Sequence, residues 1–114
     1  MKYYISIAEK NLLSTSHRKT WLAVSDVEEK ETECTEILKE TEEEIKAKFP
    51  ELPNKMVWGH YLIFKHHGAV LSIDIDYEDI ATIKREILEI ALRKDLMVLI
   101  GSEDKIYKDI EDIN

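Results

Sequence analysis

Residues 3–8 (YYISIA) separate into two faces, with Tyr3, Ile5 and Ile7 on the more apolar one and Tyr4 and Ser6 on the other. This period of two predicts a half-buried β-strand. Residues 9–20 are polar and contain several Asn, Ser and Thr, so we expect mainly loop there. Residues 21–24 are interpreted as a short second strand or as the lead-in to a helix.

The next pattern has helical spacing and predicts one long helix over residues 25–49. Ser25 and Glu28 fit a capping box, in which each side chain accepts from a free backbone N–H at the helix start. Pro50 and Pro53 are expected to end the helix. The positions expected to face inward are Val27, Cys34, Leu38, Thr41, Ile45 and Phe49.

Two strand-like runs, 57–65 and 69–75, predict a β-hairpin. With His67-Gly68 as a two-residue turn, the facing residues would have numbers that sum to 135. One face is then apolar and the other mixed, which supports this register because a one-residue slip would mix the faces. The predicted pairs include Phe64 with Leu71, Leu62 with Ile73, His60 with Ile75, and Tyr61 with Asp74.

A second helix is predicted over residues 77–94, with Asp76 as its N-cap. Residues 96–100 form a short apolar run typical of a buried strand. The order strand, helix, hairpin, helix, strand predicts a single α+β domain with the ferredoxin-like β-α-β-β-α-β arrangement. Two helices would cover one face of an antiparallel sheet, and residues 21–24 or the C-terminal tail could add an edge strand.

Acidic residues are concentrated in one part of the chain. Residues 26–51 hold eleven Asp or Glu against four Lys, a net charge of −7, whereas the whole chain of 114 residues carries −8. A localised acidic surface favours a basic protein partner. It also argues against direct binding of nucleic acid, since phosphates are bound through clustered Lys and Arg.

Two surfaces are candidate partner-binding sites. On the predicted long helix, an outward line of carboxylates lies opposite the apolar stripe: Glu29, Glu36, Glu40 and Glu43. A solvated face balanced by lysines four residues away is the alternative interpretation. The second candidate is the uncovered face of the sheet, with Tyr61 and Asp74, where an external partner, a homodimer copy or another segment of the chain could pack.

Patterns that indicate catalysis or metal binding are weak. The four histidines lack the spacing of a zinc site, so we expect no metal and no cofactor. Cys34 falls at an inward position among carboxylates, which makes it a poor nucleophile. Asp74 and Asp76 share a face of one strand and are the pair that a minor hydrolase hypothesis would use. We therefore expect no catalytic activity.

The sequence also predicts the cellular compartment of the protein. A single cysteine excludes an intramolecular disulfide, the first residues lack the pattern of a signal peptide, and no apolar run reaches the ~20 residues that span a bilayer. We expect a cytoplasmic protein that is not embedded in a membrane.

Residues 60–107 resemble a pattern of small bacterial immunity proteins encoded beside polymorphic or contact-dependent toxins. The shared features are a strand pair, an acid-capped helix and a short apolar strand, carried by Asp76, Ile80, Ile87, Ala91 and Leu96. The aromatic-Asp-Pro-Gln step that many such chains have after the last strand is replaced here by Leu-Ile-Gly-Ser. The resemblance implies an acidic protein that plugs the active site of a basic toxin, often a nuclease.

The sequence therefore predicts a non-catalytic acidic interaction protein, an immunity or inhibitor protein that neutralises a basic toxin. The alternative is a small-molecule-binding or regulatory ferredoxin-like module that acts as a homodimer. A ligand pocket near Tyr61 and Asp74 would favour the alternative.

Overall fold

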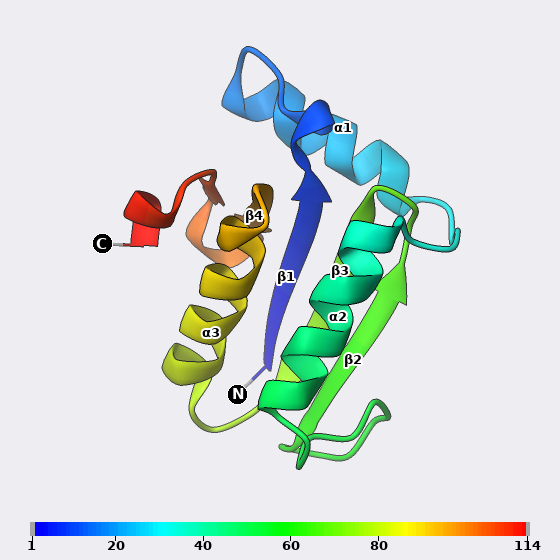
Figure 1. The fold of residues 1–114 in the computed structure, drawn as a ribbon, viewed down its shortest axis with the longest axis vertical. Helices are drawn as coiled ribbons and strands as arrows, with labels where there is room; N and C mark the ends of the chain where they lie inside the picture. Colours follow the sequence, from blue (N-terminus) through cyan, green and yellow to red (C-terminus); the bar gives the residue numbers. More distant parts are fainter. Residues whose placement is uncertain (1, 114) are drawn as a thin grey trace.

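The computed structural model describes residues 2–113 and contains one antiparallel sheet with helices on both faces (Figure 1). The α+β class is confirmed, with one helix and one strand more than predicted. The elements are β1 (Lys2–Glu9), η1 (Lys10–Leu12), α1 (His17–Glu28), α2 (Glu36–Lys48), β2 (Tyr61–His66), β3 (Val70–Asp76), α3 (Ile80–Arg93), β4 (Leu96–Ile100), η2 (Gly101–Glu103), β5 (Lys105–Tyr107) and η3 (Ile110–Ile113).

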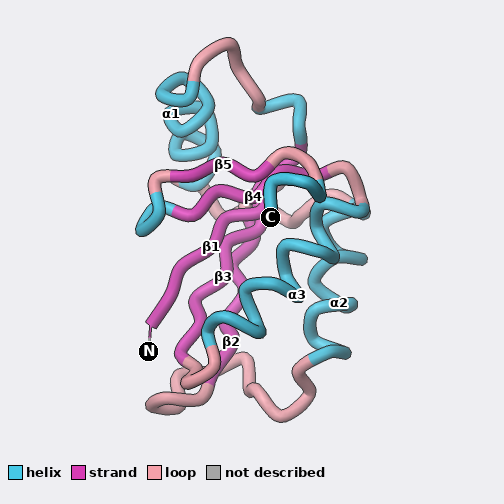
Figure 2. The backbone as a smooth tube through the Cα atoms, turned by 90° about the vertical axis from the view of Figure 1, so that its left-hand side faces the viewer, coloured by secondary structure: helices cyan, strands magenta, loops and turns pink. Residues whose placement is uncertain are grey.

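The strand order is β2-β3-β1-β4-β5, and every neighbouring pair is antiparallel. Helices α2 and α3 pack on one face, here called the front face, where they bury the main apolar core. Helix α1 packs on the opposite, back face against a smaller cluster around Val24, Val70 and Met97. Figure 2 shows that α1 lies over the upper part of the back face and leaves the lower part uncovered.

Helix α1 is the main departure from the sequence prediction. It begins after Ser16, whose Oγ accepts a hydrogen bond of 3.1 Å from the Lys19 N–H. Residues 17–20, predicted as mainly loop, and residues 21–24, predicted as a short strand or the lead-in to a helix, are therefore both helical. The predicted capping box is wrong, because Ser25 and Glu28 lie in the last turns of α1. The sequence did not predict this helix because the apolar side of α1 is small. It consists of Thr20, Val24 and two half-buried apolar residues.

The predicted long helix is interrupted between residues 29 and 35. This segment runs beside the end of β2, where the Thr32 N–H donates to the His66 carbonyl at 3.0 Å. Helix α2 then begins at Glu36 and ends before Pro50, as the prolines predicted. Most of the predicted inward positions are confirmed as buried: Cys34, Leu38, Thr41, Ile45 and Phe49.

The predicted hairpin is present, but its register is shifted by two residues. Leu62 faces Ile75 rather than Ile73, and Tyr61 faces Asp76 rather than Asp74. The two central residues of the turn are Gly68 and Ala69, because His67 N–H donates to the Val70 carbonyl at 2.9 Å and Gly68 has φ +68°. A shift of two leaves every side chain on its predicted face, so the face assignment survives the wrong register.

The last predicted helix and strand are confirmed, with one change at the helix start. Asp79 caps α3 by accepting from the Thr82 N–H at 3.2 Å, whereas Asp76 ends β3. Strand β4 is buried on both sides because α3 covers one face and α1 the other. The C-terminal tail supplies the extra edge strand, β5, and residues 21–24 do not.

The outer edge of β2 is covered by two loops. Leu62 N–H donates to the Pro53 carbonyl and Phe64 N–H to the Asn54 Oδ1, both at 3.0 Å. At the other end of the strand, Gly68 N–H donates to the Thr32 carbonyl at 2.9 Å. An uncovered edge strand is a template for pairing with another chain, so these contacts disfavour growth of the sheet at β2.

Candidate functional site

Three of the predicted partner-binding carboxylates share the outward side of α2. Glu36, Glu40 and Glu43 are exposed, and we call them the acidic face of α2. The helix places them there because Leu38, Thr41 and Ile45, at the complementary positions, are fully buried against the sheet and α3. The helical period of the sequence is therefore enough to define this face.

Part of the charge on α2 is neutralised by nearby lysines. Glu44 pairs with Lys94 at 2.6 Å and Glu42 with Lys46 at 2.7 Å. Glu36 lies 4.0 Å from Lys39, which also pairs with Glu33. Among the described residues, Glu40 and Glu43 form no ion pair within 4.0 Å. Two carboxylates in the middle of this helix thus remain available to an external cation.

Glu29 does not belong to the acidic face of α2. It is exposed in the turn that follows α1, and residues 30–35 separate it from the second helix. The prediction of four carboxylates in one line required an unbroken helix, so that alignment is wrong.

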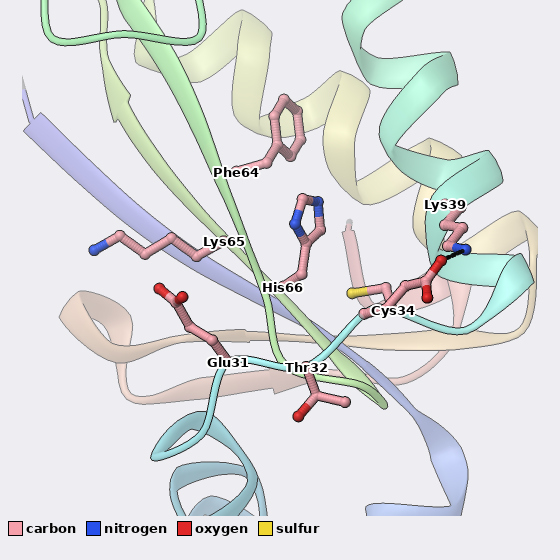
Figure 3. Close-up of a pocket in the computed structure, with 8 residues that line it drawn as sticks. Glu31, Thr32, Cys34, Lys39, Phe64, Lys65 and His66 are labelled. Carbon is pink, nitrogen blue, oxygen red and sulfur yellow. Dashed lines mark hydrogen bonds and ion pairs between the residues drawn. The ribbon is translucent and has the colours of Figure 1, made fainter.

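A cleft of about 470 Å³ opens at the N-terminal end of α2, between the α1–α2 connection and β2. In Figure 3, Phe64 and His66 extend from β2 on the side that faces α2, while Lys65 points to the other side. The remaining lining residues are Glu31, Thr32, Glu33, Cys34 and Lys39. This lining mixes both signs of charge, and the Lys39 side chain is already engaged by Glu33.

A part-buried hydrogen bond between Glu42 and His66 joins α2 to β2 beside this cleft. Glu42 is mostly buried. One of its carboxylate oxygens lies 2.5 Å from His66 Nε2, and the other lies 2.7 Å from Lys46 Nζ. Burial alone would raise the pKa of Glu42, but hydrogen bonds from Lys46 and His66 outweigh it and hold the pKa below its ordinary value. The carboxylate is thus kept ionised; one oxygen holds α2 to β2 through His66, and the other pairs with Lys46 within α2.

The candidate catalytic groups are engaged in structural contacts. Cys34 donates from Sγ to the Val70 carbonyl at 3.4 Å, and burial raises the pKa of its thiol, which lowers the thiolate fraction at neutral pH. Asp74 lies 3.6 Å from Lys65, and Asp76 accepts from the Gly59 N–H at 3.0 Å. Each aspartate is thus engaged by a different partner.

The histidines are dispersed, and each has a local partner. His17 contacts Trp21 and Asp104, His60 the Glu51 carbonyl, His66 the Glu42 carboxylate, and His67 the Lys30 carbonyl. Within residues 2–113 no group of three or more His, Cys, Asp or Glu side chains is arranged to hold a metal ion. No helix in the same range is long and apolar enough to cross a bilayer.

The second predicted surface is divided by α1. Its upper part, including Ser6, Val70 and Ser72, is buried. In the lower part Tyr4 is 44% exposed and Asp74 is half-buried, while Tyr61 is only 5% exposed and lines the floor of a shallow hollow. Tyr61 and Asp74 therefore both border the uncovered part of the back face, but Tyr61 is less exposed than the sequence predicted.

The most exposed aromatic residue was not among the predicted site residues. Trp58 is 86% exposed in the loop before β2, beside Met56 at 74%. The hairpin prediction had placed Trp58 inside a strand and next to the apolar face. The signal available in the sequence was the position of Trp58 directly before Gly59 and shortly after two prolines, a setting typical of a turn.

The chain matches no protein-family model, no curated protein and no solved structure.

Proposed function

We propose that this protein is a non-catalytic acidic binding protein that recognises a basic protein partner. The observation that carries the proposal is the acidic face of α2, where Glu40 and Glu43 are exposed and lie outside the ion pairs of the described residues. Carboxylates that have no internal partner are free to attract an external cation, and such surfaces accelerate association and select partners by charge.

The most specific form of the proposal is an immunity or inhibitor protein that acts in the cytoplasm on a basic toxin. A toxin that cleaves nucleic acid binds phosphates through Lys and Arg, and a row of carboxylates can occupy the same cations. The resemblance of residues 60–107 to immunity proteins supports this form. The engagement of Cys34, Asp74 and Asp76 in structural contacts also favours a binding role over a hydrolytic one.

We also propose that the domain has a ferredoxin-like fold with additional elements. Support comes from the strand order β4-β1-β3-β2 within the sheet and from two helices, α2 and α3, on one face. In this description α1 and β5 are additions to the common core.

The alternative, a small-molecule-binding module, has less support. The hollow beside Tyr61 and Asp74 measures about 200 Å³, which is below the roughly 300–1,000 Å³ of most ligand pockets. The larger cleft beside Cys34 is in that range, but its lining is charged rather than predominantly apolar.

The test uses the product of the adjacent open reading frame, which this proposal expects to contain a basic domain. Association rates are measured at low and high salt with the wild type and with a Glu40→Lys/Glu43→Lys variant. We expect the variant to associate at least ~10-fold more slowly at low salt, with a smaller difference at high salt. An Asp26→Lys/Glu111→Lys variant changes the net charge equally at exposed positions away from α2 and serves as the control.

Protection provides a second readout. Co-expression of the wild type or the control variant with this basic domain should preserve the growth of a bacterial host, and the α2 variant should protect less. If the α2 variant associates and protects as well as the control, the acidic face is not the binding site. If the basic domain is harmless and does not bind, the immunity assignment is wrong.

A further inference from the structure

The loop between α2 and β2 displays a group of apolar side chains to solvent. Met56 is 74% exposed, Val57 38% and Trp58 86%. The loop lies at the end of the molecule opposite α1 (Figure 1). Trp is among the residues that contribute most binding energy at protein interfaces. The exposed Trp58 is therefore a candidate contact for another molecule.

This loop is fixed in place by hydrogen bonds. Trp58 and Gly59 are the central residues of a turn closed by the His60 N–H and the Val57 carbonyl at 3.0 Å, and Gly59 has φ +76°. Gly59 N–H also donates to Asp76 Oδ2 at 3.0 Å at the end of β3. Further along the loop, the Pro53 carbonyl and Asn54 Oδ1 are bonded to β2. Trp58 is therefore presented by a preorganised turn, which reduces the entropy lost on binding.

A shallow hollow lies beside Trp58, on the part of the back face that α1 leaves uncovered. Lys2 belongs to both features, since it lines the hollow and its Nζ lies 5.1 Å from the centroid of the Trp58 ring. The hollow of about 200 Å³ is lined by Lys2, Tyr3, Tyr4, Tyr61, Asp74 and Ile75. The Lys2 cation thus lies over the projecting Trp58 ring, and the hollow contains the Asp74 carboxylate, which also lies 3.6 Å from Lys65.

We propose that this surface binds a second copy of the same chain in a two-fold dimer. Trp58 of each copy enters the hollow of the other, and Lys2 of each copy faces Asp74 of the other. A two-fold interface must be self-complementary. A projecting Trp58 beside a hollow, with one cation and one carboxylate able to pair across the two-fold axis, meets that requirement. Loop contacts along the edge of β2 disfavour pairing of two copies there, and in the proposed dimer the copies meet through their back faces.

The apolar surface around Trp58 supplies one part of the area that such a dimer needs. A standard interface buries about 800 Å² on each partner, and a single large aromatic side chain can bury about 150–250 Å². Met56, Val57 and the half-exposed Tyr4 enlarge the apolar surface around Trp58. The dimer surface is on the opposite side of the sheet from α2, so the inference extends the proposed function and does not depend on it.

The first test measures oligomeric state by analytical ultracentrifugation over a range of concentrations. The wild type is expected to dimerise, and Trp58→Ala is expected to weaken the dimer by at least ~30-fold, in line with the loss of an interface hot spot. Leu22→Ala is the matched control, because Leu22 is 53% exposed on α1 and lies outside the proposed interface.

The second test exchanges charges. A Lys2→Glu chain and an Asp74→Lys chain are each expected to be monomeric, because each would place like charges together at both contacts of its homodimer. An equimolar mixture restores opposite charges at both contacts and is expected to dimerise. Circular dichroism confirms that each chain is folded before mixing.

A wild type that stays monomeric at the highest concentration overturns the proposal. So does a dimer that Trp58→Ala leaves intact, since its contact would lie elsewhere. Binding of the monomer to lipid vesicles through Trp58 would also overturn it, by assigning the turn to a membrane surface.

Discussion

Ser72 Oγ donates a hydrogen bond of 2.5 Å to Glu28 Oε2, and this contact joins the middle of the sheet to the last turn of α1. The same carboxylate oxygen accepts from Tyr4 OH at 2.8 Å and from Ser6 Oγ at 2.9 Å. Ser6 and Ser72 are buried, so Glu28 supplies a partner to hydroxyl groups that α1 shields from water.

Replacing Glu28 should therefore loosen α1. Glu28→Ala removes the common acceptor of three hydroxyl groups, and we expect a loss of about 2–4 kcal/mol in the free energy of unfolding. Glu28→Gln keeps a neutral acceptor and should cost less, about 1 kcal/mol. Urea denaturation measures both values. The neighbouring Glu29→Ala should change stability by less than ~0.5 kcal/mol, and equal effects of Glu28→Ala and Glu29→Ala would contradict this role.

Glu103 should make the protein sensitive to acid. Burial alone would raise the pKa of this carboxyl, but hydrogen bonds from Lys84, Tyr107 and Tyr3 outweigh it and lower the pKa from 4.5 to about 2. A carboxyl whose pKa is lower in the folded state stabilises the fold above pH 4.5 and loses this contribution as the pH falls toward 2. Because the side chain is partly exposed, we expect a contribution of about 1–2 kcal/mol.

Thermal unfolding between pH 2 and pH 7 checks the Glu103 prediction. Glu103→Gln should lower the melting temperature at pH 7, and the difference from the wild type should shrink toward pH 2. Glu111→Gln, at an exposed position in η3, should follow the wild-type curve throughout. A difference that is constant with pH would show that the charge of Glu103 is not responsible.

Asn54 should protect the edge of β2. Asn54→Ala removes the acceptor for the Phe64 N–H, and we expect a loss of about 1 kcal/mol. The exposed edge should also increase aggregation during heating, which light scattering detects. Asn11→Ala, in the exposed part of η1, is the control. If the two variants aggregate equally, the edge does not depend on Asn54.

Cys34 should react slowly with thiol reagents in the folded protein. The residue is 5% exposed, and burial raises the pKa of its thiol, so both access and the thiolate fraction are reduced. At pH 8 we expect labelling by a disulfide reagent to be limited by opening of the structure, and to become fast in urea. Immediate labelling without denaturant would restore Cys34 as a candidate nucleophile.

The parts of the fold that the sequence predicted are those with continuous apolar patterns. Ile83, Ile87 and Leu88 identify α3, and the uninterrupted run of β4 identifies a strand buried on both faces. No glycine or proline marks the break before α2. The break depends on a hydrogen bond between Thr32 and β2, a strand distant in the sequence, so the local sequence could not reveal it. Likewise, a hairpin shift of two residues preserves both faces, so the alternation of side chains could not distinguish the two registers.

The candidate sites also differ in whether the local sequence pattern could predict them. Helical period alone placed Glu36, Glu40 and Glu43 together, because that alignment depends on one helix. The group formed by Lys2, Trp58 and Asp74 depends on three segments far apart in the sequence. It becomes visible when β1, the loop before β2 and β3 are placed side by side.

The sheet separates the acidic face of α2 from the Trp58 turn. In the two-fold dimer proposed above, the back faces meet and both α2 helices point outward in different directions. One assembly could then bind two basic domains at once. If those domains were linked in one molecule, binding of the first would raise the effective concentration of the second, and the resulting avidity would exceed the affinity of a single site.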